Sequence, residues 1–316
     1  MKTIEALKKL KTKFNLIPVM ILVLALAFTS CNKDDDNMAE PSSNTIADIA
    51  VANPDFSILV DALTRADLVG AVDDKNAELT VFAPTNDAFI ALLSDLGASS
   101  LDDIPTETLK NVLLYHVVQG KAMSSGLSSG YIPTLATANG NNLSMYVKVD
   151  NGVFLNKNAQ VTAADIEADN GVIHVVNKVL LPPNVVNIAI DNDDFSILVS
   201  AVVKAGLVDA LSADGPFTVF APTNAAFEQL FADLGISGIA DLTAEQLTPI
   251  LTYHVVSGNI LSGDLKSGSV ETLNNSNDLM VDLSSGVKIN SSNVVKADIQ
   301  GTNGVVHVID KVLLPQ

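Results

Sequence analysis

The sequence has no tryptophan, a single cysteine and only 5% aromatic residues among its 316 positions. Hydrophobic residues still make up 48% of the chain, so its cores must be built from valine, leucine, isoleucine and alanine. The single cysteine has no second thiol with which to form a disulfide. The length is enough for about two domains of ordinary size.

Positive charge is also scarce, and it is unevenly placed. The chain has 18 basic and 36 acidic residues, and residues 1–30 contain five of the lysines but only one glutamate. The rest of the chain therefore has 13 basic and 35 acidic residues, a net charge of −22. Such a surface repels phosphate backbones and anionic head groups, which argues against nucleic acid as a partner.

Residues 1–30 have the pattern of a lipoprotein signal peptide. Lysines up to Lys13 precede an apolar run of 13 residues, Leu16–Phe28, which is shorter than the roughly 20 residues needed to span a bilayer. The alternative is an uncleaved anchor, against which the short run and Pro18 argue. The segment FTSC, which ends at Cys31, resembles a bacterial lipobox. We expect Cys31 to carry acyl chains such as palmitate and to hold the chain to a membrane.

Residues 31–43 are predicted to form an acidic, flexible tether. No aspartate follows Cys31 directly, and Lys33 is followed by three aspartates, an order that resembles the surface-export signal of Bacteroidetes-type lipoproteins. The same residues are also a solvated charge run, and the two interpretations are compatible. We therefore expect an outer-membrane lipoprotein exposed at the cell surface.

The remaining chain is duplicated. The segment TVFAPTNDAF (Thr80–Phe89) returns as TVFAPTNAAF (Thr218–Phe227), with nine of ten residues identical. A second segment, NGVIHVVNKVLLP (Asn170–Pro182), returns as NGVVHVIDKVLLP (Asn303–Pro315). The repeat period of 133 to 139 residues is the size of a domain rather than of a solenoid unit.

We predict a first domain at residues 44–182 and a second at residues 183–316. Only Pro182-Pro183-Asn184 separates the last repeated segment of one copy from the first helix-like segment of the next. A joint this short and proline-rich predicts a monomeric tandem with limited bending.

Helical signals dominate the first half of the first copy. Apolar residues spaced i, i+3, i+4 and i+7 predict a helix over residues 56–63 with Asp55 as its N-cap. A second apolar stripe predicts a helix that ends at Gly97, and Thr106 is expected to cap a third.

Strand signals begin with one early strand and dominate from Tyr115 on. Leu79–Ala83 is a short apolar strand that Pro84 should end, since proline lacks the N–H for a ladder hydrogen bond. Turn residues at Asp150-Asn151-Gly152 predict a β-hairpin, and Ser284-Ser285-Gly286 predicts its counterpart in the second copy. The order predicts an α+β domain with its helices mainly in the N-terminal half.

The repeated segments resemble the fasciclin-like domain family. The family's opening box TVFAPTNxAF, a Tyr-His motif and the closing box NGVIHVVDKVLLP each occur twice and in order. This resemblance implies two tandem β-wedge or sandwich domains flanked by helices. It also implies a role in cell adhesion or binding at the cell surface.

The opening box has a structural interpretation at every position. Thr85 or Asn86 is placed to cap the helix that follows the strand, and the remaining residues supply core. We therefore expect Asn86, its repeat Asn224 and the closing-box histidines His174 and His307 to be structural.

An enzyme would need its histidines in a catalytic arrangement. All four lie in the repeated segments, and an enzymatic interpretation would pair His116 with His174 or with Asp165 for acid–base or metal chemistry. Strand alternation instead places His174 among buried valines, which favours a neutral ring that satisfies backbone groups. The sequence has no HExxH, no GxSxG and no cysteine nucleophile. We predict a protein that is not an enzyme and needs no cofactor.

The acidic run DNDDF does not have the pattern of a calcium loop. An EF-hand starting at Asp191 needs glycine at its sixth position and glutamate at its twelfth, where the chain has Ser196 and Val202. Helix capping by Asp193 or Asp194 is the simpler expectation, and no metal site is predicted.

The fasciclin resemblance also implies candidate partner-binding residues, because animal relatives use a Tyr-His and an Asp-Ile pair in integrin recognition. The matching residues are Tyr115, His116, Asp165, Ile166, Tyr253, His254, Asp298 and Ile299. The favoured function is adhesion to an extracellular glycan, matrix or cell-surface protein. The alternative is a carrier of a small apolar ligand, since some family members hold carotenoids.

Overall fold

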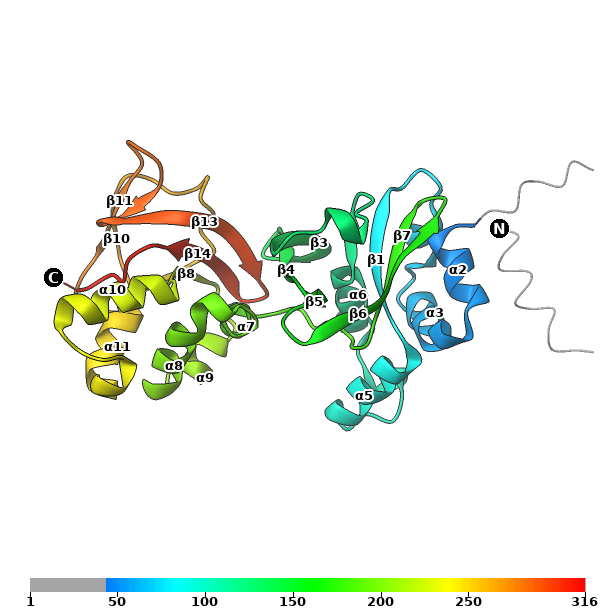
Figure 1. The fold of residues 1–316 in the computed structure, drawn as a ribbon, viewed down its shortest axis with the longest axis horizontal. Helices are drawn as coiled ribbons and strands as arrows, with labels where there is room; N and C mark the ends of the chain where they lie inside the picture. The colour runs from blue at the N-terminus through cyan, green and yellow to red at the C-terminus, as the bar shows by residue number, and fades with distance from the viewer. Residues whose placement is uncertain (1–43, 316) are drawn as a thin grey trace, which may run out of the picture. The chain divides into compact units, whose positions relative to one another are not determined.

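The computed structural model describes residues 44–315. The predicted signal peptide at 1–30, the lipidation of Cys31 and the tether at 31–43 lie outside the described residues. Each copy of the repeat forms its own seven-stranded sheet, with helices concentrated in its N-terminal half (Figure 1). The prediction of two tandem α+β domains is confirmed.

The first copy builds its helical layer before most of its sheet. Its helices and 3₁₀ turns are α2 (Ile46–Ala52), η2 (Pro54–Phe56), α3 (Ser57–Arg65), α4 (Val69–Asp73), α5 (Asn86–Leu96), η3 (Leu101–Asp103), α6 (Thr106–Tyr115) and η4 (Ser124–Gly126). Its strands are β1 (Leu79–Pro84), β2 (Val117–Gln119), β3 (Gly130–Ala138), β4 (Asn141–Asp150), β5 (Gly152–Leu155), β6 (Ala159–Ala168) and β7 (Gly171–Val176).

The second copy repeats this order. Its helices and turns are α7 (Val185–Asp191), η5 (Asp193–Phe195), α8 (Ser196–Lys204), α9 (Val208–Ser212), α10 (Asn224–Leu234), η6 (Ile239–Asp241) and α11 (Ala244–Tyr253). Its strands are β8 (Phe217–Pro222), β9 (Val255–Ser257), β10 (Gly268–Val270), β11 (Leu279–Asp282), β12 (Lys288–Ile289), β13 (Ser292–Gly301) and β14 (Gly304–Ile309).

The two repeated boxes form neighbouring strands in each sheet, one strand in from an edge. The strand order is β2-β1-β7-β6-β5-β4-β3 in the first copy and β10-β11-β12-β13-β14-β8-β9 in the second. β1 pairs in parallel with β7, opposing Phe82 to His174, and β8 pairs in parallel with β14 in the same register. The opening and closing boxes therefore form adjacent interior strands, each paired on both sides, which explains why both are repeated so closely.

Both predicted hairpins are confirmed. β4 and β5 pair antiparallel around Asp150-Asn151-Gly152, and β11 pairs with β12 on either side of Ser284-Ser285-Gly286. β1 runs one residue further than predicted, through Pro84, because Thr85 donates its N–H to the Val176 carbonyl and continues the pairing.

The helix caps differ in part from the predictions. Thr85 caps α5 by accepting a hydrogen bond from the Ala88 N–H, and Gly97 ends the same helix with a left-handed φ of 64°, both as expected. Thr106 is instead the first residue inside α6, with Pro105 at its N-cap.

The predicted aspartate caps, Asp55 for α3 and Asp193 or Asp194 for α8, are wrong for the same reason. The chain enters α3 and α8 through a 3₁₀ turn, and the asparagine before that turn supplies the cap. Asn53 accepts from the Asp55 N–H, and Asn192 accepts from the Asp194 N–H. Asp55, Asp193 and Asp194 therefore lie inside the turns and do not cap the helices.

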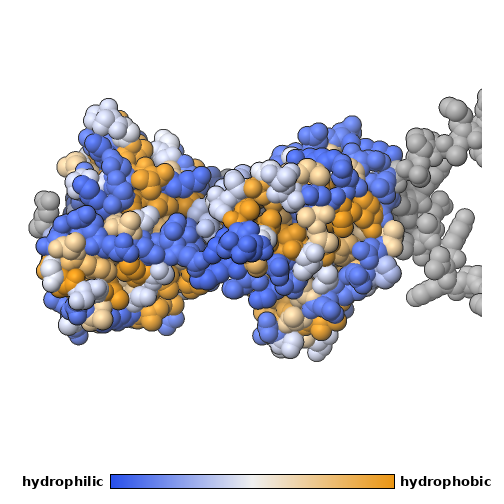
Figure 2. All heavy atoms as spheres, viewed as in Figure 1, coloured by the Kyte–Doolittle hydropathy of each residue, from blue (hydrophilic) through white to orange (hydrophobic). Residues whose placement is uncertain are grey.

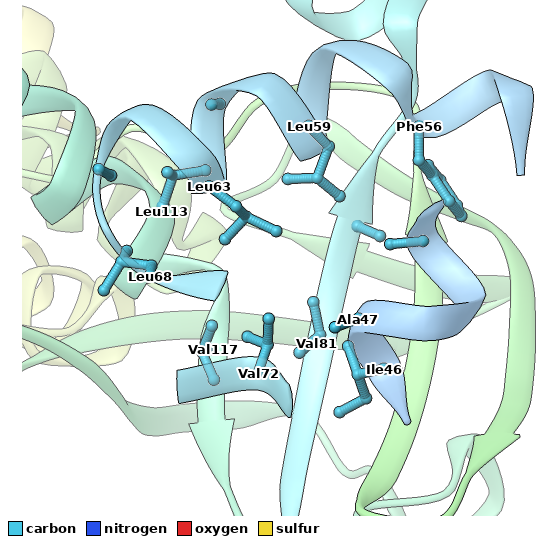
Figure 3. Close-up of a cluster of buried hydrophobic side chains, with 14 of the residues drawn as sticks. Ile46, Ala47, Phe56, Leu59, Leu63, Leu68, Val72, Val81, Leu113 and Val117 are labelled. Carbon is cyan, nitrogen blue, oxygen red and sulfur yellow. The ribbon is translucent and has the colours of Figure 1, made fainter. Parts of the chain in front are cut away.

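Each copy has an aliphatic core between its helices and its sheet. In the first copy, Figure 3 shows Ile46 of α2 and Leu63 of α3 packed around Val81 of β1, all less than a tenth exposed. Burying each such side chain contributes about 1.5–3 kcal/mol. A second cluster around Phe82 and Tyr115 fills the space under β3, β4 and β5.

Candidate functional site

The closing-box histidines are fully buried and make their hydrogen bonds to the backbone, while the Asp165 and Asp298 carboxylates lie 4.0 and 3.9 Å from His174 Nδ1 and His307 Nδ1. In the first copy, His174 Nδ1 accepts the Asp165 N–H at 3.2 Å, and its Nε2 lies 2.9 Å from the Ala122 carbonyl. A backbone N–H can only donate and a carbonyl can only accept, so the ring is neutral and carries its proton on Nε2. The ring also stacks on Phe82, with centroids 5.4 Å apart.

His307 repeats this arrangement in the second copy. Its Nδ1 accepts the Asp298 N–H at 3.2 Å, and its Nε2 donates to the Ile260 carbonyl at 2.9 Å. Burial lowers the pKa of His307 below its ordinary value. Neither closing-box ring has a free nitrogen for a proton transfer or a metal.

The histidines of the Tyr-His motif are fixed in the opposite tautomer. His116 Nδ1 donates to the Val112 carbonyl at 2.7 Å, and Nε2 accepts the Leu180 N–H at 2.8 Å. Each ring thus ties the C-terminal end of a helix to the last residues of the closing box. Burial lowers the pKa of His116 to about 4.

His254 makes the matching contacts in the second copy, to the Ile250 carbonyl and the Leu313 N–H. Its pKa is likewise lowered to about 4 by burial. Both rings therefore stay neutral at physiological pH, and neither can act there as an acid or as a cation.

The tyrosines of the motif are also buried. The Tyr115 hydroxyl donates to the Ser144 carbonyl and accepts from Asn156 Nδ2, each at 2.9 Å, and burial raises its pKa. Tyr253 donates to the Asp278 carbonyl and accepts from Asn290. Both side chains hold a helix end against the sheet, and neither reaches the surface.

The aspartates of the Asp-Ile pairs are the exposed members of the candidate set. Asp165 lies at a register irregularity of β6 with φ at 61°, and its carboxylate accepts from Ser124 N–H at 2.7 Å and Ser124 Oγ at 2.5 Å. These bonds hold the pKa of Asp165 below its ordinary value. Its side chain is 32% exposed.

Asp298 forms the same corner with Ser262 in the second copy, at 2.7 and 2.5 Å, with φ at 62° and 41% of its side chain exposed. We call these two features the Asp-Ser corners. Their neighbours differ, since Ile166 is half-buried and Ile299 is only 1% exposed. The candidate set is therefore split between buried supports and two partly exposed carboxylates.

Several supporting residues carry no signal that sequence reasoning could have detected. Ser124 and Asn156 lie in loop-like sequence, and their partners are 41 residues away along the chain. Asn170 looks like a turn residue, but it is 1% exposed. It accepts from the Ile46 N–H and donates to the carbonyls of Val72 and Asp74.

The opening-box asparagines are structural clamps rather than helix caps. Asn86 Oδ1 accepts the Ile58 N–H at 2.9 Å, while Nδ2 donates to the Pro54 carbonyl and Ser57 Oγ. Asn224 makes the same three bonds at the start of α8. Each asparagine ties the start of one helix to the start of another.

We expect Asn86→Ala to lower the free energy of unfolding by about 1–3 kcal/mol, because it leaves the Ile58 N–H without its partner. Asn86→Asp keeps the acceptor and should recover part of the loss. Urea unfolding of both variants measures this. Unchanged stability of Asn86→Ala together with lost partner binding would show that the asparagine belongs to a binding site instead.

Two kinds of feature are absent from the described residues, 44–315. No group of three or more His, Cys, Asp or Glu side chains is placed to hold a metal ion within this part of the chain. No helix in the same range is long and apolar enough to cross a bilayer.

Known proteins match both copies. The fasciclin domain family model matches residues 54–182 and 193–315. A protein of Synechocystis sp. is 47% identical over 131 residues, which are 42% of this chain and 73% of that protein. The transforming growth factor-beta-induced protein ig-h3 of Sus scrofa is 32% identical across 75% of this chain, but this chain covers only 34% of that protein.

A fungal protein and a solved structure match most of both copies. A fasciclin-like arabinogalactan protein of Phaeosphaeria nodorum is 27% identical over 86% of this chain and 89% of its own length. The solved FAS1 domain pair of the insect cell adhesion molecule fasciclin I is 20% identical, covers 85% of this chain and 95% of its own, and has a TM-score of 0.48. Because the family model accounts for nearly all of both repeats, this chain belongs to the fasciclin domain family, with two tandem domains.

Proposed function

We propose that this protein is a non-catalytic adhesion protein whose tandem domains bind an extracellular glycan, matrix component or cell-surface protein. Fasciclin domains are typically involved in adhesion and in binding extracellular proteins. The observation that carries the proposal is that each buried ring nitrogen of the four histidines is already bonded to the backbone. The repeated polar residues thus build the scaffold, and recognition falls to the surface.

The Asp-Ser corners are the surface features that this proposal uses. Each domain presents one, with the carboxylate fixed in place by two hydrogen bonds and still partly exposed. A fixed carboxylate on an acidic body suits a neutral, basic or cation-bridged partner. Two such corners on one chain increase the effective concentration of the second contact once the first has formed.

The test uses the chain from Ser43 to Gln316, which contains both fasciclin domains, on an array of glycans and matrix proteins. Asp165→Asn and Asp298→Asn keep the shape of the side chain and tolerate a positive φ, while removing its charge. We expect either substitution alone to weaken retention about tenfold or more through lost avidity, and the double variant to lose the partner. Full retention by the double variant would overturn the assignment of the corners.

We further propose that acyl chains on Cys31 anchor the protein to the outer membrane with its domains facing outwards. The support is the order of basic, apolar and small residues before Cys31 and the charged run after it. Metabolic labelling with a fatty-acid analogue should tag the wild type but not Cys31→Ala. Protease added to intact cells should remove the domains, and protected domains would contradict surface exposure.

A further inference from the structure

The second domain contains an apolar cavity that the first domain lacks. It has a volume of about 130 Å³ and lies between α7, α8 and α9 on one side and β8 and β14 on the other. Its lining is almost entirely aliphatic. The corresponding space in the first domain has a volume of only about 20 Å³, which is room for about one water molecule.

Three buried lining positions carry smaller side chains in the second domain. The second domain has Val185, Val202 and Val306 where the first has Ile46, Leu63 and Ile173, so it lacks one carbon atom at each position. All six side chains are less than a tenth exposed. Figure 3 shows two of the larger residues, Ile46 and Leu63, within the packed core of the first domain.

Three other lining positions are larger in the second domain, and two of them, Ala47 and Val72, are buried in the first domain. Val186, Ile190 and Leu211 replace Ala47, Val51 and Val72, and they are half-buried or exposed. The lining of the second domain is therefore smaller at three positions and larger at three others.

The cavity also has an apolar opening to solvent. Its lining includes Ile190 and Val203, which are 40% and 61% exposed, whereas the first domain has the polar Thr64 in place of Val203. Figure 2 shows apolar residues at the surface over the helical half of the second domain. The wall of the cavity therefore includes apolar residues that are in contact with solvent.

The acidic surface of the second domain favours a neutral ligand. Among the helices that line the cavity, α9 carries Asp209 and α7 ends at Asp191, whose pKa burial raises to about 7. Lys204 on α8 is already bonded to the carbonyls of Ile239 and Ala240. The whole second domain, residues 183–316, has 5 basic and 15 acidic residues. A carboxylate head group would be repelled, and no free cation on these three helices compensates it.

We propose that this cavity is a binding site for the end of a single neutral hydrocarbon chain. An apolar cavity of about 150 Å³ stays dry and takes a molecule the size of benzene, so the space here fits about six carbon atoms of an unbranched chain. A carotenoid is far larger than this space. The site goes beyond adhesion, because it lies on the helical side of the second domain and uses none of the residues of the Asp-Ser corners.

Calorimetric melting of the chain from Ser43 to Gln316 with 1-octanol tests the proposal. At about ten times its Kd, octanol should raise the melting temperature of the second domain by about 3–6 °C. Sodium octanoate at the same concentration should give a much smaller rise, because its head group is charged. No rise with octanol, or an equal rise with octanoate, would overturn the proposal.

The matched control is Val202→Leu with Val306→Ile, which installs the residues of the first domain. This variant should melt at or above the wild-type temperature without ligand, since it fills a void, and should lose the octanol shift. If the variant kept the octanol-induced rise in melting temperature, octanol would bind outside the cavity and the proposal would be wrong. The hydrocarbon chain in the cavity could belong to a membrane lipid or to a free small molecule. Co-sedimentation of the wild type and of the variant with phosphatidylcholine vesicles distinguishes these two sources.

The reverse exchange gives a second, independent readout. Leu63→Val with Ile173→Val should open the corresponding space in the first domain. We expect octanol then to raise the melting temperature of that domain too. If octanol did not raise the melting temperature of the folded variant's first domain, these two positions would not control the volume of the space, which contradicts the proposal.

Discussion

Replacing Gly171 by alanine is expected to destabilise the first domain by about 4 kcal/mol or more, which is enough to unfold many domains. Gly171 begins β7 with φ at 153°, and a Cβ atom there would lie 1.9 Å from the carbonyl oxygen of Leu79 in β1. β1 cannot move away, because the Leu79 N–H is bonded to the Asn170 carbonyl. Gly304 meets the Phe217 carbonyl in the same way, at 2.2 Å.

Urea unfolding followed by circular dichroism measures this effect, and Gly70→Ala is the control. Gly70 lies in α4 without a positive φ, and a Cβ atom added to it would meet nothing within 4 Å. Alanine there should therefore be neutral or stabilise by roughly 0.5–1 kcal/mol. If Gly171→Ala cost less than about 1 kcal/mol, the close parallel contact of β1 and β7 would be wrong.

Lowering the pH from 7 to 5 is expected to cost each domain about 2 kcal/mol through a single histidine. The pKa of His116 and of His254 is about 4 in the folded domain, against 6.5 for an exposed histidine. Between these values the unfolded chain binds more protons than the folded one, so stability falls as the pH falls. The loss starts near pH 6.5 and is complete near pH 4.

His254→Gln isolates this contribution in the second domain. Glutamine offers one donor and one acceptor, as the neutral ring does, but it does not titrate. The variant should lose about 2 kcal/mol less than wild type between pH 7 and 5, as measured by urea unfolding at each pH. Identical pH slopes for wild type and variant would mean that folding does not shift the pKa of His254.

Regular elements were predictable because their signals are local. Strand alternation placed His174 on a buried face, and the turn residues around Gly152 identified a hairpin whose partners are adjacent in sequence. Helix entry was harder, because Asn53 and Asp55 are both good capping residues. Only the 3₁₀ turn that starts with Pro54 decides between them.

The site was less predictable because its bonds connect distant segments. The ring of His116 is completed by the Leu180 N–H, 64 residues further along the chain, and no local pattern reveals that partner. Asp165 was identified through the family resemblance, but its left-handed backbone and its bonds to Ser124 were not. Three of the residues that line the cavity differ from those of the first domain by one carbon atom, and such exchanges look conservative in the sequence.

Nitrogen-15 NMR of the four imidazole rings at pH 7 tests most directly the central claim that the repeated polar residues are scaffold. We expect four neutral rings with fixed tautomers. His116 and His254 should carry the proton on Nδ1, and His174 and His307 should carry it on Nε2. A ring that exchanges between tautomers, or that is partly protonated at this pH, would be available for chemistry and would contradict the claim.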